Sequence, residues 1–183
     1  MYKVNIMIEG IAPVLFNGWT ERAREALEGP SGRGGRTTLA DKRLEAREKA
    51  YRNKAGDYII PGTMLKSCII NGAKMANLKS NRRSLATYLK GAIFIEDASL
   101  GKNDCDYLDE RIIPTKNGAD IQVRPAFTEG WTARAEITVV DDAISWTDLE
   151  TAIQAAGMYS GIGSHRPDFG RFTLEEVEEV ETS

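Results

Sequence analysis

The chain has 183 residues, of which 42% are hydrophobic and 28% charged, and its formal net charge is −3. This length and balance are typical of a soluble globular protein, and we expect residues 1–183 to form a single domain. No apolar run is long enough to cross a membrane and no signal peptide opens the chain, so we expect a cytoplasmic protein with no membrane partner. One histidine and two isolated cysteines predict no disulfide framework, no metal site and no cofactor.

Charge is distributed unevenly along the chain. Residues 33–54 contain eight Lys or Arg and three acids, residues 74–90 contain five Lys or Arg and no acid, and five glutamates lie between 175 and 181. Basic stretches on an acidic chain predict a localised surface for a polyanion. The alternative is that both stretches are solvated helix faces.

The N-terminal part predicts one strand followed by a long insertion. Apolar and polar residues alternate over 2–8, as in a half-buried strand, and Asn17-Gly18 turns the chain. The elements expected next are a short helix over 20–27, a flexible glycine-rich loop over 29–36 and a mostly polar helix over 39–54. We therefore expect residues 17–56 to project from the domain as a partly flexible insertion that a partner can order.

The remainder predicts alternating strands and helices. A strand at 58–60 and a turn at 61–62 precede an amphipathic helix with Thr63 as its N-cap, and a capping box of Thr147 and Glu150 opens another helix. The other expected elements are a basic helix over 78–90, strands over 92–95, 131–140 and 169–177, a loop over 97–110 and a hairpin of 111–114 with 121–127. This order approximates βαββαβ. The predicted fold is therefore α+β, with a ferredoxin-like core as in RNA-recognition motifs, a long insertion after the first strand and a glycine-rich loop before the last.

The segment at 60–67, IPGTMLKS, is the first candidate anion site. Free backbone N–H groups and the positive end of the helix dipole favour an anion beside Gly62 and Thr63, and Lys66 adds a positive charge in the first turn. The segment lacks the glycine pattern of a nucleotide-binding P-loop. The structural alternative is that turn and helix only build the fold, with Lys66 pointing into water.

The segment at 161–172, GIGSHRPDFGRF, is the second candidate site. Gly161 and Gly163 lack side chains, so a backbone segment or a phosphate can approach closely, while His165, Arg166 and Arg171 supply hydrogen-bond donors. The alternative is a helix-to-strand connection that needs unusual backbone angles.

Together the two segments resemble the signatures of the RAMP superfamily of CRISPR-associated RNA-binding proteins. IPGTMLKS resembles that superfamily's IPGSSLKG motif, and the segment at 161–172 is similar to its glycine-rich loop before the last core strand. The resemblance covers only these two segments. It implies a ferredoxin-like core, a role in antiviral defence and a likeness to the crRNA-binding backbone subunit of effector complexes, which polymerises along single-stranded RNA through its phosphates. A stand-alone or phage-encoded relative is the alternative for so short a chain.

The sequence and the resemblance thus predict a non-enzymatic protein that binds single-stranded RNA or DNA, with RNA favoured, as a homo-oligomer or filament and alongside other effector subunits. No recognisable catalytic constellation is present, so no catalytic residue is assigned, and a catalytic His165 is the less favoured hypothesis. The alternatives are a phage single-stranded DNA-binding protein of the same fold, a RAMP-type endoribonuclease, and an assembly protein without nucleic acid. The predicted nucleic-acid-binding residues are Arg33, Arg36, Lys42, Arg43, Arg47, Gly62, Thr63, Lys66, Gly161, Gly163, His165, Arg166 and Arg171.

Overall fold

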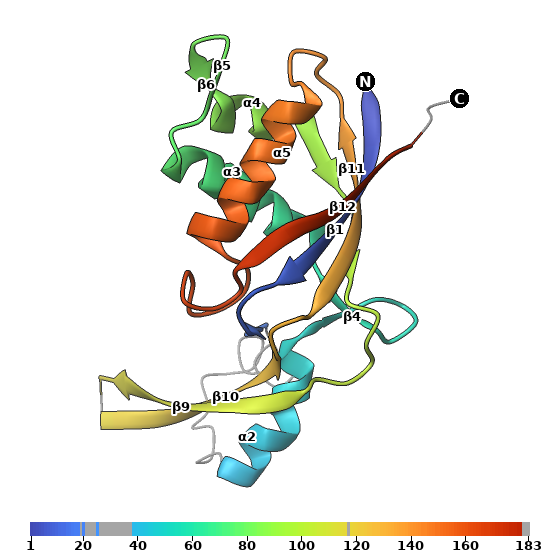
Figure 1. The fold of residues 1–183 in the computed structure, drawn as a ribbon. Helices are drawn as coiled ribbons and strands as arrows, with labels where there is room; N and C mark the ends of the chain where they lie inside the picture. Colours follow the sequence, from blue (N-terminus) through green and yellow to red (C-terminus); the bar gives the residue numbers. More distant parts are fainter. Residues whose placement is uncertain (19, 21–24, 26–37, 117, 181–183) are drawn as a thin grey trace.

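The computed structural model of the chain describes residues 1–18, 20, 25, 38–116 and 118–180. Its largest element is a seven-stranded sheet with the order β12-β1-β11-β8-β4-β3, in which β7 also pairs with β11 (Figure 1). The strands of this main sheet are β1 (Tyr2–Gly10), β3 (Tyr51–Arg52), β4 (Tyr58–Ile60), β7 (Ile93–Ile95), β8 (Ala98–Ser99), β11 (Thr132–Val139) and β12 (Phe172–Val180).

The alternating pattern of β1 places this strand at the centre of the main sheet. Val4, Ile6 and Ile8 are buried, and Asn5 and Glu9 between and beyond them are exposed. β1 pairs antiparallel with β11 on one side and with β12 on the other. A strand with one apolar face and two partners has its register fixed, because a slip of one residue would turn that face to water.

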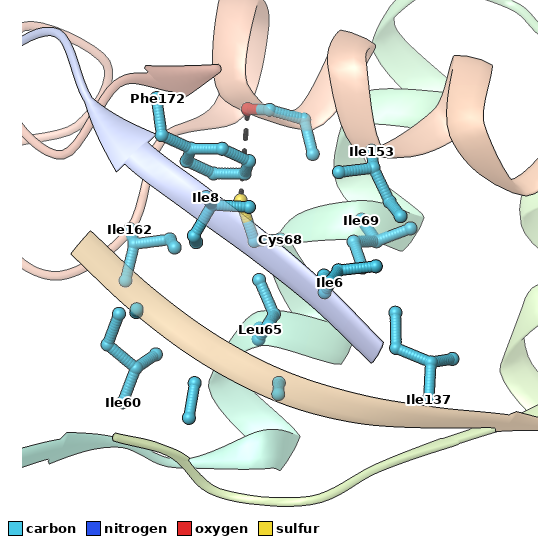
Figure 2. Packing of buried hydrophobic residues seen from close by; sticks show 14 of the residues in the cluster. Ile6, Ile8, Ile60, Leu65, Cys68, Ile69, Ile137, Ile153, Ile162 and Phe172 are labelled. Atoms are coloured by element: carbon cyan, nitrogen blue, oxygen red, sulfur yellow. Dashed lines mark hydrogen bonds between the residues drawn. The ribbon is translucent and has the colours of Figure 1, made fainter. Parts of the chain in front are cut away.

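One face of the main sheet is covered by helices (Figure 1). They are α3 (Gly62–Met75), α4 (Leu85–Ala92), α5 (Trp146–Ala155) and the π-helical turn η2 (Ala156–Ser160). Leu65 and Ile69 of α3 pack in the core beside Ile6 of β1, as Figure 2 shows. α3 and η2 approach closely because Gly72 has no side chain: a Cβ there would lie 2.3 Å from the backbone nitrogen of Ala156.

A second, three-stranded sheet lies at one end of the molecule, away from α4 and α5 (Figure 1). It has the order β2-β10-β9, with β2 at Val14–Leu15, β9 at Tyr107–Thr115 and β10 at Gly118–Phe127. α2 (Leu39–Ala46) and the short 3-10 helix η1 (Arg47–Lys49) lie against β10. Within the predicted insertion, α2 and η1 therefore pack on the hairpin of β9 and β10, which is the hairpin expected from the sequence, whereas β3 joins the edge of the main sheet.

The α+β class is confirmed. The finer ferredoxin-like assignment stays a prediction, because the main sheet has seven strands where that pattern has four. The single domain with a projecting insertion also stays a prediction. The loop at 29–36 and almost all of the short helix at 20–27 lie outside the described residues.

Several local predictions were wrong. Residues 78–90 do not form one basic helix: β5 (Lys79–Ser80) and β6 (Arg83–Ser84) pair as a small hairpin before α4. Asn81 and Arg82 have φ of 48° and 68°, which a tight hairpin turn requires and a helix does not allow. The predicted loop over 97–110 contains β8 and the start of β9.

The predicted helix starts also needed correction. α5 is capped by Ser145 and Asp148 in place of Thr147 and Glu150, so the helix begins two residues earlier than expected. α3 follows Pro61 directly, which places Thr63 inside its first turn and leaves the N-cap without a side-chain hydrogen bond. In both cases the pattern locates the helix correctly and misplaces its first residue, as is usual at helix ends.

Candidate nucleic-acid interface

The glycine-rich segment forms a loop that is held against the body of the protein by its backbone. The N–H of Ile162 donates to the carbonyl of Gly170 at 2.9 Å, which closes the loop on itself. The N–H groups of Ser164 and Gly170 donate to the carbonyls of Leu15 and Pro13, both at 2.8 Å. These hydrogen bonds join the loop to the segment around β2 and hold the loop backbone in place.

The loop glycines are required by close approach of the backbone. Gly161, Gly163 and Gly170 have φ of 69°, 79° and 73°, a region that favours glycine. A Cβ on Gly170 would lie 1.8 Å from the carbonyl oxygen of Ile162, and one on Gly163 would lie 2.3 Å from that of Leu15. Both sequence interpretations, close approach of a backbone segment and unusual backbone angles, therefore apply. Close approach of a phosphate stays a prediction.

Arg124 of β10 is a buried cation at the base of this loop. Its side chain is only 6% exposed, its Nη1 lies 2.7 Å from Nε2 of His165, and its Nη2 donates to the Gln122 side chain. Among the described residues, its Nε has no hydrogen-bond partner and no carboxylate forms an ion pair with the guanidinium. Burial lowers the pKa of Arg124, while the nearby Asp109 carboxylate, which is paired with Arg111, opposes this shift. Burying a guanidinium without an ion-pair partner costs free energy, and binding of an anion to it offsets that cost.

His165 joins the loop to the β9–β10 hairpin. Burial lowers the pKa of His165, and the neighbouring Arg124 and Arg111 lower it further. The neutral imidazole can accept the hydrogen bond from Arg124. A second contact lies alongside, where the Arg111 guanidinium stands 4.6 Å from the centre of the Phe169 ring and is paired with Asp109.

A groove of about 800 Å³ opens between the loop, η2 and the C-terminal half of α3. Lys74, Arg124 and Arg166 contribute three cations to its walls, and the described residues contribute no carboxylate. Its lining comprises Asn71, Lys74 and Met75 from α3, Arg124 from β10, Tyr159 and Ser160 from η2, and Gly163, Ser164, His165, Arg166 and Pro167 from the loop. Phosphate groups match such a surface, because arginine and lysine are the side chains that bind them most strongly.

The opposite character marks a smaller cavity of about 280 Å³ on strands β1, β11 and β12. Five acids line it together with Arg134 as its only cation among the described residues: Glu96, Asp97, Glu136, Glu176 and Glu178. Acidic side chains repel phosphates, so this surface is a poor place for nucleic acid. The chain therefore has two surfaces of opposite charge, the cationic groove and this acidic cavity, which its net charge of −3 does not reveal.

The predicted anion site at the start of α3 is not part of the groove. The N–H of Gly62 donates to the Asp97 carboxylate at 2.9 Å, so a carboxylate of the chain already occupies the end of this helix. The ammonium of Lys66 donates to the carbonyl of Ile93 at 2.7 Å and lies 5.2 Å from the Phe94 ring. Nucleic-acid binding by Gly62, Thr63 and Lys66 stays a prediction that would require these internal contacts to change.

The predicted cations of α2 and η1 also have partners within the chain. Lys42 pairs with Asp120, Arg43 lies 2.6 Å from Glu110, and Arg47 lies 3.2 Å from Asp104. These pairs reduce the charge that the three side chains offer to a ligand. The predicted residues Arg33 and Arg36 lie outside the described residues. Arg171 lies outside the groove lining, and its Nε donates to the carbonyl of Pro167 at 2.9 Å, within the loop.

The groove thus unites Gly163, His165 and Arg166 from the predicted set, with Gly161 at the edge of the same loop. The predicted set omits Arg124, and it omits Lys74 although this residue belongs to the basic stretch over 74–90. A signal for Arg124 was present, because it lies in a strand between the buried residues Val123 and Ala126. A charged residue in an apolar strand is rarely buried without a function or a partner.

Two further features follow from the described ranges. No three His, Cys, Asp or Glu side chains gather there as metal ligands would. No helix in the described part of the chain has the length and apolar character needed to cross a membrane.

No protein-family model matches the sequence, and no curated protein matches it either. Among solved structures, the chain is similar to a chain of the Type III-B Cmr-beta complex, determined by cryo-EM with cognate target RNA bound. The TM-score is 0.63 at 10% sequence identity, and the match covers 98% of this chain but 61% of the neighbour. At this low sequence identity, the structural similarity shows a shared fold and nothing more.

Proposed function

We propose that the protein binds single-stranded nucleic acid, with RNA favoured over DNA, and that it does so without cleaving the strand. The observation that carries this proposal is the groove, in which the described residues place three cations and no carboxylate, on a chain of net charge −3. One of the three, Arg124, is buried and forms no ion pair with a described residue. A strand that supplies phosphates to Arg124 and Arg166 would offset the cost of burying the Arg124 guanidinium.

The preference for RNA rests on likeness. The two sequence segments resemble RAMP signatures, and the solved neighbour comes from a Type III-B Cmr-beta complex with target RNA bound. Further parts of the proposal are that several copies assemble along one strand and that effector subunits bind beside them in a prokaryotic cytoplasm. Because contacts to phosphates carry no sequence information, a protein that binds RNA mainly through its phosphates should have a weak sequence preference.

A charge-reversal pair tests the proposal. Fluorescence anisotropy with a labelled single-stranded RNA would be compared for the wild-type protein, Arg166→Glu and Lys90→Glu. Both substitutions change the net charge equally, and both side chains are exposed, but only Arg166 lines the groove. We expect Arg166→Glu to weaken binding at least tenfold, about 1.4 kcal/mol, and Lys90→Glu to have little effect. Wild-type protein that fails to bind at low salt would refute the proposal.

The same samples test the absence of cleavage and the assembly. Labelled RNA incubated with the protein should remain intact on a denaturing gel, and turnover that His165→Ala abolishes would replace our proposal with the endoribonuclease alternative. Longer strands should bind more copies of the protein in sedimentation experiments. A fixed one-to-one ratio at every strand length would contradict assembly along the strand.

A further inference from the structure

Two large apolar side chains line the groove together with its three cations. Tyr159 of η2 is 45% exposed and Met75 of α3 is 62% exposed, and both line the groove with Lys74 and Arg166. Large apolar side chains that remain exposed together in a concave surface mark a place where a ligand binds. A groove that bound only phosphates would gain nothing from them.

The position of Tyr159 is fixed by the backbone of η2. Gly157 and Ala156, which precede it, are buried, and a Cβ on Gly157 would lie 1.9 Å from the carbonyl oxygen of Phe172. This close contact presses the inner side of η2 against β12. Tyr159 lies on the exposed side of this turn, so the aromatic ring is presented on a rigid support at little further cost in conformational entropy.

The proposal rests on the function proposed above and names the part of the strand that the groove accepts. We propose that the groove holds one unstacked nucleotide, with its base against the ring of Tyr159 and Met75 and its phosphates on Arg166 and Arg124. The groove volume of about 800 Å³ falls within the range of pockets that enclose a small ligand. Every base has a π-face, so stacking on Tyr159 strengthens binding without requiring a particular sequence.

The test compares two ligands that carry the same phosphates. One is a labelled oligouridylate, and the other is an oligoribonucleotide of equal length whose residues are all abasic. Tyr159→Ala should weaken binding of oligouridylate about 5- to 150-fold, the effect of losing one stacked base, and leave the abasic ligand within about twofold. Tyr159→Phe should bind both ligands as the wild type does, since the ring is retained. Arg166→Ala should weaken binding of both ligands.

The outcomes separate this inference from the function on which it rests. If Tyr159→Ala weakens both ligands equally, or neither, no base stacks on Tyr159 and the inference is overturned. If the wild-type protein binds neither ligand, the proposed function itself is refuted. Circular dichroism of Tyr159→Ala should match the wild type, because a side chain this exposed contributes little to the core.

Discussion

The salt dependence of RNA binding provides a quantitative test of which cations contact phosphates. Each phosphate neutralised on a single strand changes the slope of log K against log salt by about −0.7, because bound counterions are released. If Lys74, Arg124 and Arg166 each contact one phosphate, the groove contributes a slope of about −2.1. Raising the salt from about 50 to 200 mM would then weaken binding about 18-fold through the groove alone.

Removing one groove cation should therefore reduce the slope by a known amount. We expect Lys74→Ala and Arg166→Ala each to make the slope about 0.7 shallower, which cuts the groove's loss over the same salt range to about sevenfold. The matched controls are Lys42→Ala and Arg43→Ala, whose charges are paired with Asp120 and Glu110. Anisotropy titrations at several salt concentrations would give all slopes. Control variants that flatten the slope as much as Arg166→Ala would refute the assignment of the phosphates to the groove.

Three further predictions follow from the same loop and core. Burial and Arg124 lower the pKa of His165, whereas a bound phosphate favours the protonated imidazole. RNA affinity should therefore rise as the pH falls below 6.5, the ordinary pKa of histidine, and His165→Gln should abolish this rise in titrations at several pH values. Burial raises the pKa of the Cys68 thiol to about 11, so iodoacetamide at about pH 8 should modify Cys105 and not Cys68 in the native protein. Equal labelling of the two cysteines by mass spectrometry would contradict the burial of Cys68. Gly170→Ala should lower the free energy of unfolding in urea by about 2–4 kcal/mol, because the added Cβ meets the carbonyl oxygen of Ile162. Gly101→Ala, at a position with a similar φ and open space around it, should lower it by about 1–2 kcal/mol. Equal losses in the two variants would rule out the steric contribution at Gly170.

The amino-acid pattern predicted those features that depend on near neighbours in the chain. Alternation over 2–8 and 131–140 located β1 and β11, because each of these strands has one face in the core and its period is visible in a few residues. The glycine-rich segment was recognisable because positive φ angles leave a direct trace in composition. The start of α5 was misplaced because two overlapping capping pairs are present in the sequence, and the structure forms the pair of Ser145 with Asp148.

The charge of a surface, in contrast, depends on residues that are distant in the chain. Lys42 looks like a free cation in a basic stretch, but folding pairs it with Asp120, 78 residues away. Arg124 stands out in the sequence only as a charge within a strand, but folding buries it beside His165, 41 residues away, without a carboxylate in an ion pair with it among the described residues. The sequence by itself determined the α+β class, the basic loop and the presence of enough cations to hold a polyanion. Only the tertiary structure decided which of those cations are already neutralised, because ion pairing falls off within a few ångströms and those distances are set by the fold.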